Sequence, residues 1–391
     1  MKRRKFLASA PLLLGSSCLV SAAQIKGQSV GRVHSIDANG DADAQIKKAL
    51  KAIESDLGGI LFFGVGEFNI KNNYELRLPE SACFAIYGFG PGISKLICHS
   101  LSCAFKIRIR TDIASFSGNP SVQISGISLL AKGRCGTAIH LCPDDADQRG
   151  GVATKLLEDL EVTGQTGSDG WALGIHAEDV TFVTITNYLY RSQKGKGVGI
   201  KFSGDSNPCD QHLNSIRILG GKYGIEVEGH TEGVYMSKCT MIACESGIYW
   251  HPFEPEPLLC LTGSHINSFG PSIRAVNLLQ PVIQGNLFYQ HDIDKRWAGI
   301  QIESTQGTPY DLLNISGNTF HGHPAASEET FGIYIVASGG GMISGNVFSA
   351  LKTGIFLDQQ CRSISVSGVS FLNSPAGSKI LDLGKNNLIQ N

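Results

Sequence analysis

Two glutamates, Glu226 and Glu228, stand two residues apart in the segment GIEVE. In an extended strand, residues i and i+2 point to the same face, with their Cα atoms about 6.5–7 Å apart. This spacing favours an inverting glycoside hydrolase, which holds its general acid and general base about 6.5–9.5 Å apart. Two carboxylates beside Tyr249 should raise the pKa of one of them, so that it carries a proton to donate, while Lys201 holds the other ionised. Asp205 is a third candidate acid.

A repeated Gly-Ile marker indicates how these residues are positioned. It occurs at 174, 199, 224, 247, 299, 332 and 354, at intervals of 22 to 33 residues, with Ser272-Ile273 in the one vacant place. A second marker recurs between them as IQGNLF (283–288), ISGNTF (315–320) and ISGNVF (343–348). Regular self-similarity of this length is typical of a solenoid.

The chemistry of the repeats favours strands over helices. GIEVE and GIQIE alternate apolar and polar residues with period two, which predicts short strands with one face buried. About 22–25 residues suit three strands and their turns, so the sequence predicts an all-β fold, a parallel β-helix of about 12–13 coils. The repeated Asn should stack from coil to coil, with amides hydrogen-bonded along the axis.

Stacking of the Gly-Ile strands would align their outward residues in two columns about 4.8 Å apart from coil to coil. Aromatic, cationic and carboxylate side chains share these columns, a mixture that suits carbohydrate, because rings cover sugar faces and cations bind hydroxyls or carboxylates. The residues predicted to bind substrate are His176, Lys201, Tyr249, His251, Arg274, Gln301 and Glu303. The alternative is that each of these residues, and the glutamate pair, is ordinary solvent-exposed surface.

The first 23 residues have the pattern of a signal peptide that resembles a twin-arginine signal. A basic start (KRRKFL) precedes a short apolar run and Ser-Ala-Ala at 21–23. Without its four basic residues, the chain has 29 basic and 34 acidic residues, a net charge of −5 that excludes general attraction to nucleic acid. No apolar run is long enough to span a membrane. We therefore expect a periplasmic or extracellular protein.

The cysteines leave two interpretations open. Cys98/Cys103, Cys135/Cys142 and Cys239/Cys244 are close enough in sequence to form disulfides in an oxidising compartment. Isolated cysteines in a β core are the alternative, which we favour slightly. The spacing predicts no metal site and no cofactor; a lyase reaction would need a charge neutraliser, either Ca²⁺ or an arginine.

The opening of the chain resembles that of the pectate lyase superfamily, which includes rhamnogalacturonase-like enzymes and phage tailspike depolymerases. DANGDAD (37–43), an expected helix at 44–56, GGILFF (58–63) and GEFNI (66–70) carry the resemblance. It implies a helical cap on a right-handed parallel β-helix, with a groove along one sheet. We expect one domain over 24–391: the cap at 33–70, coils at about 71–375 and an end segment at 376–391. The polygalacturonase motifs do not occur in their usual order, so no catalytic residue is transferred from the family.

Four functions remain open. The first is an exported enzyme that hydrolyses an acidic or bacterial polysaccharide through Glu226 and Glu228. The second is a β-eliminating lyase, in which Lys201, Arg274 and His251 would supply the base and neutralise charge. The third is a secreted glycan-binding β-helix without catalysis. The fourth is a tailspike relative, which would be a trimer, whereas the other three functions predict a monomer.

Overall fold

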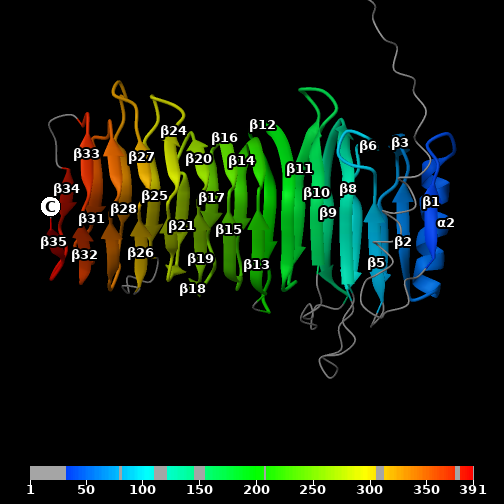
Figure 1. Cartoon of the computed structure of the whole chain (residues 1–391), viewed down its shortest axis with the longest axis horizontal. Helices are drawn as coiled ribbons and strands as arrows, with labels where there is room; N and C mark the ends of the chain where they lie inside the picture. Colours follow the sequence, from blue (N-terminus) through cyan, green and yellow to red (C-terminus); the bar gives the residue numbers. More distant parts are fainter. Residues whose placement is uncertain are drawn as a thin grey trace, which may run out of the picture.

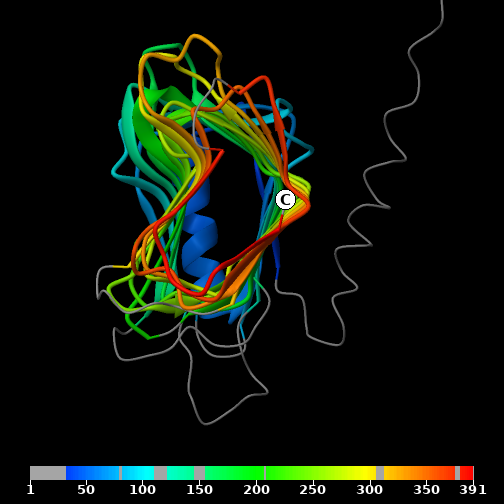
Figure 2. The ribbon, with the colours of Figure 1, turned by 90° about the vertical axis from the view of Figure 1, so that its left-hand side faces the viewer.

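One helix near the N-terminal end and a long stack of parallel strands make up the described part of the chain in the computed structural model (Figure 1). The structure describes residues 32–78, 82–109, 121–144, 155–206, 208–304, 312–374 and 379–390. The signal peptide expected at 1–23 lies outside the described residues. The strands wind into a tube whose wall has three sides, each a ladder of strands hydrogen-bonded from coil to coil (Figure 2).

The ladders are numbered in the order in which the chain visits them. The first ladder contains β1 (Val33–Ile36), β2 (Gly58–Phe63), β5 (Cys83–Tyr87), β8 (Ser121–Lys132), β10 (Lys155–Gly164), β12 (Val183–Ser203), β13 (Cys209–Asn214), β15 (Glu232–Ser237), β19 (Leu259–Thr262), β23 (Val282–Gln284), β26 (Leu313–Ser316), β29 (Gly341–Ser344), β32 (Ile364–Ser367) and β35 (Leu388–Gln390). The second contains β3 (Gly66–Ile70), β6 (Ser94–His99), parts of β8, β10 and β12, then β14 (Arg217–Val227), β16 (Thr240–Cys244), β20 (His265–Ser268), β24 (Leu287–Gln290), β27 (Thr319–His321), β30 (Val347–Ser349) and β33 (Ser370–Leu372).

The third ladder carries the Gly-Ile strands. It contains β4 (Tyr74–Leu78), β7 (Cys103–Ile109), β9 (Arg134–Pro143), β11 (Gly170–Glu178), the C-terminal parts of β12 and β14, β17 (Ser246–Trp250), β21 (Ile273–Val276), β25 (Trp297–Glu303), β28 (Thr330–Ile335), β31 (Thr353–Leu357) and β34 (Ile380–Asp382). Within the described residues this ladder has twelve strands, which agrees with the predicted number of coils. A small separate sheet pairs β18 (Glu256–Pro257) with β22 (Leu278–Leu279).

The helix α2 (Ala42–Ser55) covers the N-terminal opening of the tube. It begins at the N-cap Asp41, whose side chain accepts a hydrogen bond from the Ala44 backbone N–H. Its buried face, which includes Ile46, Leu50 and Ile53, packs on the first strands. The helix thus covers apolar core that the first coil would otherwise expose, as the resemblance implied.

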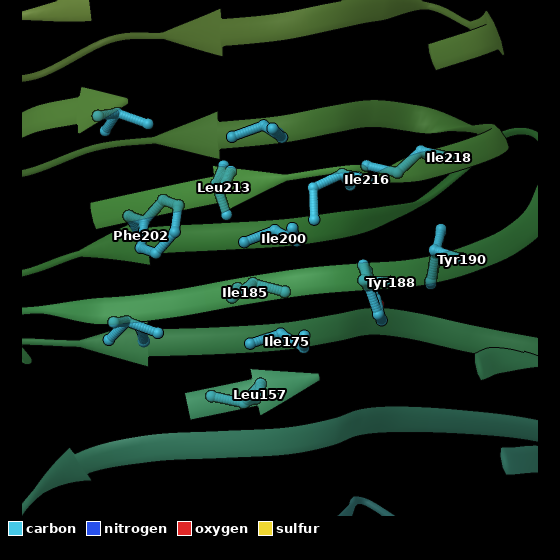
Figure 3. Close-up of a cluster of buried hydrophobic side chains, with 14 of the residues drawn as sticks. Leu157, Ile175, Ile185, Tyr188, Tyr190, Ile200, Phe202, Leu213, Ile216 and Ile218 are labelled. Carbon is cyan, nitrogen blue, oxygen red and sulfur yellow. The ribbon is translucent and has the colours of Figure 1, made fainter. Parts of the chain in front are cut away.

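The interior is filled by stacked apolar side chains from all three ladders. Ile175 and Ile200 of the third ladder, and Leu157 and Ile185 of the first ladder, show the pattern, since each pair consists of equivalent residues of successive coils (Figure 3). Stacked Phe288, Phe320 and Phe348 continue it, with adjacent ring centroids 5.0 and 5.1 Å apart. Because one side of each strand must face this core, the opposite side chains are fixed on the outer surface.

A ladder of buried asparagines stabilises the turns beside the second ladder. Asn286, Asn318 and Asn346 lie on successive coils; Asn318 Nδ2 donates to Asn346 Oδ1 at 3.0 Å, and Asn286 Nδ2 donates to Asn318 Oδ1 at 3.0 Å. Each Nδ2 also donates to a backbone carbonyl of the preceding coil, as Asn318 does to Ile283 at 2.9 Å. This is the predicted asparagine stack.

The six cysteines of the pairs proposed from the sequence lie in the described coils. In none of the three pairs proposed from the sequence is a disulfide formed; Cys98, Cys135, Cys142, Cys239 and Cys244 are buried. The interpretation as isolated core cysteines is confirmed for Cys98, Cys135, Cys239 and Cys244, which belong to the hydrophobic core. None of the helices found in the described ranges has the length and apolar character to cross a membrane.

Candidate active site

The third ladder aligns the predicted first column. Successive Cα partners run from His176 to Lys201, Glu226, Tyr249, Arg274 and Gln301. The residues on either side of Glu226, Ile225 and Val227, are fully buried, so the glutamate faces outward. The register that the Gly-Ile marker predicted is therefore correct.

Four charged or titratable side chains meet at the centre of this column. Lys201 Nζ lies 2.6 Å from Glu228 Oε1 and 3.8 Å from Glu226 Oε2. His251 Nε2 lies 3.2 Å from Glu226 Oε1 and 3.9 Å from Glu228 Oε2. These four residues, called the central cluster below, come from three consecutive coils: Lys201 lies in β12, Glu226 in β14, Glu228 directly after β14 and His251 directly after β17. Their side chains are 14–32% exposed, so solvent reaches them.

The pKa of Glu226 is shifted by its burial and by two neighbouring side chains. Burial alone would raise the pKa of Glu226, but the hydrogen bond from His251 and the positive charge of Lys201 lower it overall. Of the two roles predicted for the pair, Glu226 therefore fits the ionised carboxylate and not the proton donor, because Lys201 and His251 stabilise its negative charge.

The separation of the two carboxylates differs from that expected for an inverting glycoside hydrolase. An oxygen of each glutamate and a ring nitrogen of His251 lie within 4.8 Å of one another. This is shorter than the separation of about 6.5–9.5 Å that leaves room for a water in inverting hydrolases. The side chains converge because both carboxylates approach Lys201. The same three donors could surround a divalent cation, but the ammonium group already supplies the positive charge there.

Aromatic rings extend the site toward the C-terminal coils. Tyr249 stacks on His251 with ring centroids 4.1 Å apart and contacts Tyr223 at 4.6 Å. The Arg274 guanidinium lies over the Tyr249 ring, 5.3 Å from its centroid. Tyr249 thus connects the central cluster to a cationic side chain on the next coil.

A hollow of about 420 Å³ lies at this end of the cluster. Its cationic residues are Lys222, Arg274 and Arg296, and Tyr223 and Gln301 also line it. Arg296 directly precedes the first residue of β25. We call this feature the cationic hollow. Glu245 is the one acidic residue of the lining, and because the three cations outnumber it, the hollow suits an anionic group.

The remaining predicted residues lie around the cluster with different partners. Gln301 Nε2 donates to Glu303 Oε1 at 2.7 Å, so these two residues meet each other. The His176 ring nitrogen Nε2 lies 2.8 Å from Ser203 Oγ, and burial lowers the His176 pKa to about 4, so this imidazole is neutral near pH 7. Asp205 lies exposed in the bend after β12, where its charge acts on His230. No described contact brings Asp205 to the glutamate pair.

Several residues of this face were missed by the sequence analysis. His140 is the Cα partner of His176, with ring centroids 4.5 Å apart, and Lys106 is the partner of His140. The Gly-Ile search overlooked them because Ala138 stands before Ile139 where later coils have glycine. Lys222 and Arg296 were missed because they lie on the N-terminal side of the marker. The period-two pattern of AIHL (138–141) was the available signal.

Comparisons with known proteins concern the fold. A family model described as right handed beta helix region matches residues 223–391. No curated protein matches the sequence. Gene product 12 of bacteriophage phi29, in its pre-mature form, is similar with a TM-score of 0.58 and 14% identity, over 90% of this chain and 54% of that chain. The chain therefore spans about half the length of the phage protein.

Two bacterial enzymes have similar structures. The A-module of the mannuronan C-5 epimerase AlgE6 from Azotobacter vinelandii gives a TM-score of 0.52 and 14% identity over 90% of this chain and 95% of that chain. The family 28 exopolygalacturonase of Yersinia enterocolitica gives a TM-score of 0.51 and 9% identity over 93% of this chain and 78% of that chain. At such identities the similarity is one of fold. Together with the family match and the three ladders, it identifies this chain as a right-handed parallel β-helix protein.

Proposed function

We propose that the protein is an exported enzyme that cleaves an acidic polysaccharide by β-elimination at a uronate residue. The observation that carries this proposal is the adjacency of the central cluster, with an ionised Glu226 hydrogen-bonded to His251, to the cationic hollow. The leader-like segment at 1–23 supports export as part of the proposal. Two of the similar folds are named as a mannuronan epimerase and an exopolygalacturonase, so acidic polysaccharides are ligands of this fold elsewhere.

The cationic hollow would bind and neutralise the substrate carboxylate. Lys222, Arg274 and Arg296 all line it, and Arg274 is held over Tyr249. Neutralising a carboxylate acidifies the adjacent C–H bond, because negative charge develops on the carboxyl group as the proton leaves. A uronate in this position would present its C5 proton toward Tyr249 and His251.

His251 is the proposed general base. Its Nε2–H donates to Glu226, which leaves the lone pair on Nδ1 to accept a proton. The C5 proton passes to Nδ1, the C–H electron pair forms the C4=C5 double bond, and the C4–O4 electron pair leaves with the oxygen. The departing oxygen takes a proton from the Tyr249 hydroxyl or from water. Glu226 stabilises the resulting imidazolium.

Hydrolysis by Glu226 and Glu228 is the second candidate, supported by two carboxylates on one strand face. It requires a protonated carboxyl as the general acid, and the lowered pKa of Glu226 opposes that role. Glu228, nearer Lys201, would then have to be the acid. A glycan-binding function without catalysis uses the same face and predicts binding alone.

The test is to incubate the purified protein with uronate polymers and with neutral polysaccharides as controls. Elimination gives new chain ends that absorb in the ultraviolet through the C4=C5 double bond, whereas hydrolysis gives reducing ends without that absorbance. His251→Ala should abolish the reaction, whereas Glu67→Gln, in an exposed ion pair with Lys95 on the second ladder, should not. Absence of cleavage on every uronate polymer, or equal cleavage by His251→Ala, would contradict the proposal.

A further inference from the structure

A second group of side chains on the third ladder has the composition of a zinc site. His140 and Cys142 come from β9 and Glu178 from the end of β11. His140 Nε2 lies 2.8 Å from Glu178 Oε2, and one donor atom of each of the three residues lies within 4.8 Å of the others. Glu178 lies far from His140 and Cys142 in the sequence and meets them only through coil stacking, so no metal site was predicted from residue spacing.

The Cys142 thiol differs from the other buried cysteines. Cys142 is 3% exposed, and no hydrogen bond of its thiol is found among the described residues. Five other buried cysteines each donate to a backbone carbonyl: Cys98, Cys135, Cys239, Cys244 and Cys361. A buried thiol without such a bond, next to an imidazole and a carboxylate, is a donor available to a metal.

The surroundings hold these donors in place. The His140 ring stacks on His176 with an interplanar angle of 9°, and His176 is in turn held by Ser203. Arg108, the Cα partner of Cys142, is engaged by the Glu75 carboxylate in a short ion pair, which offsets the charge of this guanidinium. Lys106, the partner of His140, is the remaining nearby cation. Thiolate and carboxylate ligands together bring two negative charges to the site.

We propose that His140, Cys142 and Glu178 bind one Zn²⁺ ion through Nε2, Sγ and a carboxylate oxygen, with the fourth position open to the groove. Nitrogen, sulfur and oxygen donors together fit zinc, whereas Ca²⁺ and Mg²⁺ take oxygen ligands. Tetrahedral zinc bonds place ligand atoms about 3.3–3.8 Å apart, so His140 and Glu178 must separate by about 0.5 Å to admit the ion. The site does not depend on the reaction proposed above.

The proposed zinc site lies on the same ladder as the central cluster, so the ion could contact the same bound polysaccharide. Glu178 is the Cα partner of Ser203, and Glu228 lies one strand further. The Cα atoms of Glu178 and Glu228 are therefore about 9.6 Å apart, two strand spacings, and Lys201 of the central cluster lies on the strand between them. A ligand oxygen of a bound polysaccharide, a carboxylate or a hydroxyl, would complete the open coordination position.

The experiment measures metal binding by the full chain. The protein is freed of metal with a chelator, titrated with Zn²⁺ by calorimetry and analysed for metal content after gel filtration. Parallel loading with Co²⁺ reports a sulfur ligand through the thiolate-to-cobalt charge-transfer band. The expected result is one Zn²⁺ per chain and a charge-transfer band with Co²⁺.

Variants assign the ligands. Cys142→Ser should abolish the charge-transfer band, and both Cys142→Ser and His140→Gln should weaken zinc binding at least tenfold, with unchanged circular dichroism. Cys260→Ser, a half-buried cysteine elsewhere, and Glu226→Gln, in the central cluster, should keep both signals. His140→Gln decides the question if Cys142→Ser fails to fold. Failure of the wild type to bind stoichiometric zinc, or retention of zinc by the His140 variant, overturns the proposal.

Discussion

His251 Nε2 lies 3.2 Å from Glu226 Oε1, although the two residues are 25 positions apart in the chain. The coil-to-coil register produces this contact, since Val227 and Trp250, the residues that follow Glu226 and precede His251, are Cα partners. A carboxylate that accepts from one imidazole nitrogen fixes the tautomer and leaves the other nitrogen as a base. The pair is therefore a unit that orients and activates His251.

Replacing Glu226 by Gln should slow cleavage by about 10²–10⁴-fold, because an amide cannot stabilise the imidazolium that forms on His251. The rate of formation of unsaturated ends, measured at saturating substrate, checks this. Circular dichroism should be unchanged, because the side chain faces outward. A Glu226→Gln variant with wild-type turnover would remove the pair from the mechanism.

Arg274→Ala should weaken substrate binding more than turnover. The guanidinium lines the cationic hollow and lies over Tyr249, so its loss removes a charge contact to the substrate. We expect KM to rise about tenfold or more, equivalent to about 1.4 kcal/mol, and the salt dependence of KM to become shallower. Lys95→Gln, on the second ladder, provides the matched control for loss of one positive charge. An equal effect in both variants would mean that the substrate is attracted by the overall charge of the protein and not by contact with this hollow.

Asn318→Ala should destabilise the fold by about 3 kcal/mol. The buried amide donates to the Ile283 carbonyl and accepts from the Asn286 backbone N–H, so its removal leaves buried groups unsatisfied. Urea unfolding measures the change in the free energy of unfolding. Asn314→Ala on the same coil, where the side chain is only partly buried, should cost about 0.5 kcal/mol or less. Similar losses in the two variants would contradict a stabilising asparagine ladder.

Lys155 should make stability depend on pH. Its side chain is fully buried, with Nζ donating to the Thr181 carbonyl at 3.0 Å, and burial lowers its pKa to about 7. Because the folded pKa lies below the unfolded one, the unfolded state binds more protons between these values, and the free energy of unfolding rises with pH. Relative to Lys155→Met, the wild type should gain about 1 kcal/mol per pH unit between about pH 7.5 and 9. Urea unfolding measures the free energy of unfolding of both proteins at each pH. If it changed equally with pH in the two proteins, Lys155 would not titrate in this range.

The fold was predictable because the Gly-Ile marker recurs once per coil in most of the coils. Glycine before isoleucine marks the point where each coil begins its third-ladder strand, and period-two alternation then assigns inward and outward residues. For this reason the column from His176 to Gln301 was predicted correctly. His140 was not found, because Ala138 replaces the marker glycine and only backbone pairing reveals its place.

The chemistry of the site was less predictable than its position. Strand geometry gives the directions of Glu226 and Glu228 but not the conformations of Lys201 and His251, which decide the pKa of Glu226. Lys222 and Arg296 precede the marker, in parts of the coil that vary in length. Asp205 was expected near the pair because it follows a strand of the preceding coil, but its bend carries it toward His230.

The alternation of inward and outward side chains along β14 determines which mutations preserve the packing of the core. Ile225 and Val227 fill the interior while Glu226 and Glu228 face the ligand side, so adding or deleting one residue within this strand would exchange the two sets. Substitution of the outward residues alone leaves the packing untouched. New specificities can therefore arise by point changes at every second position, whereas insertions are confined to the bends between strands.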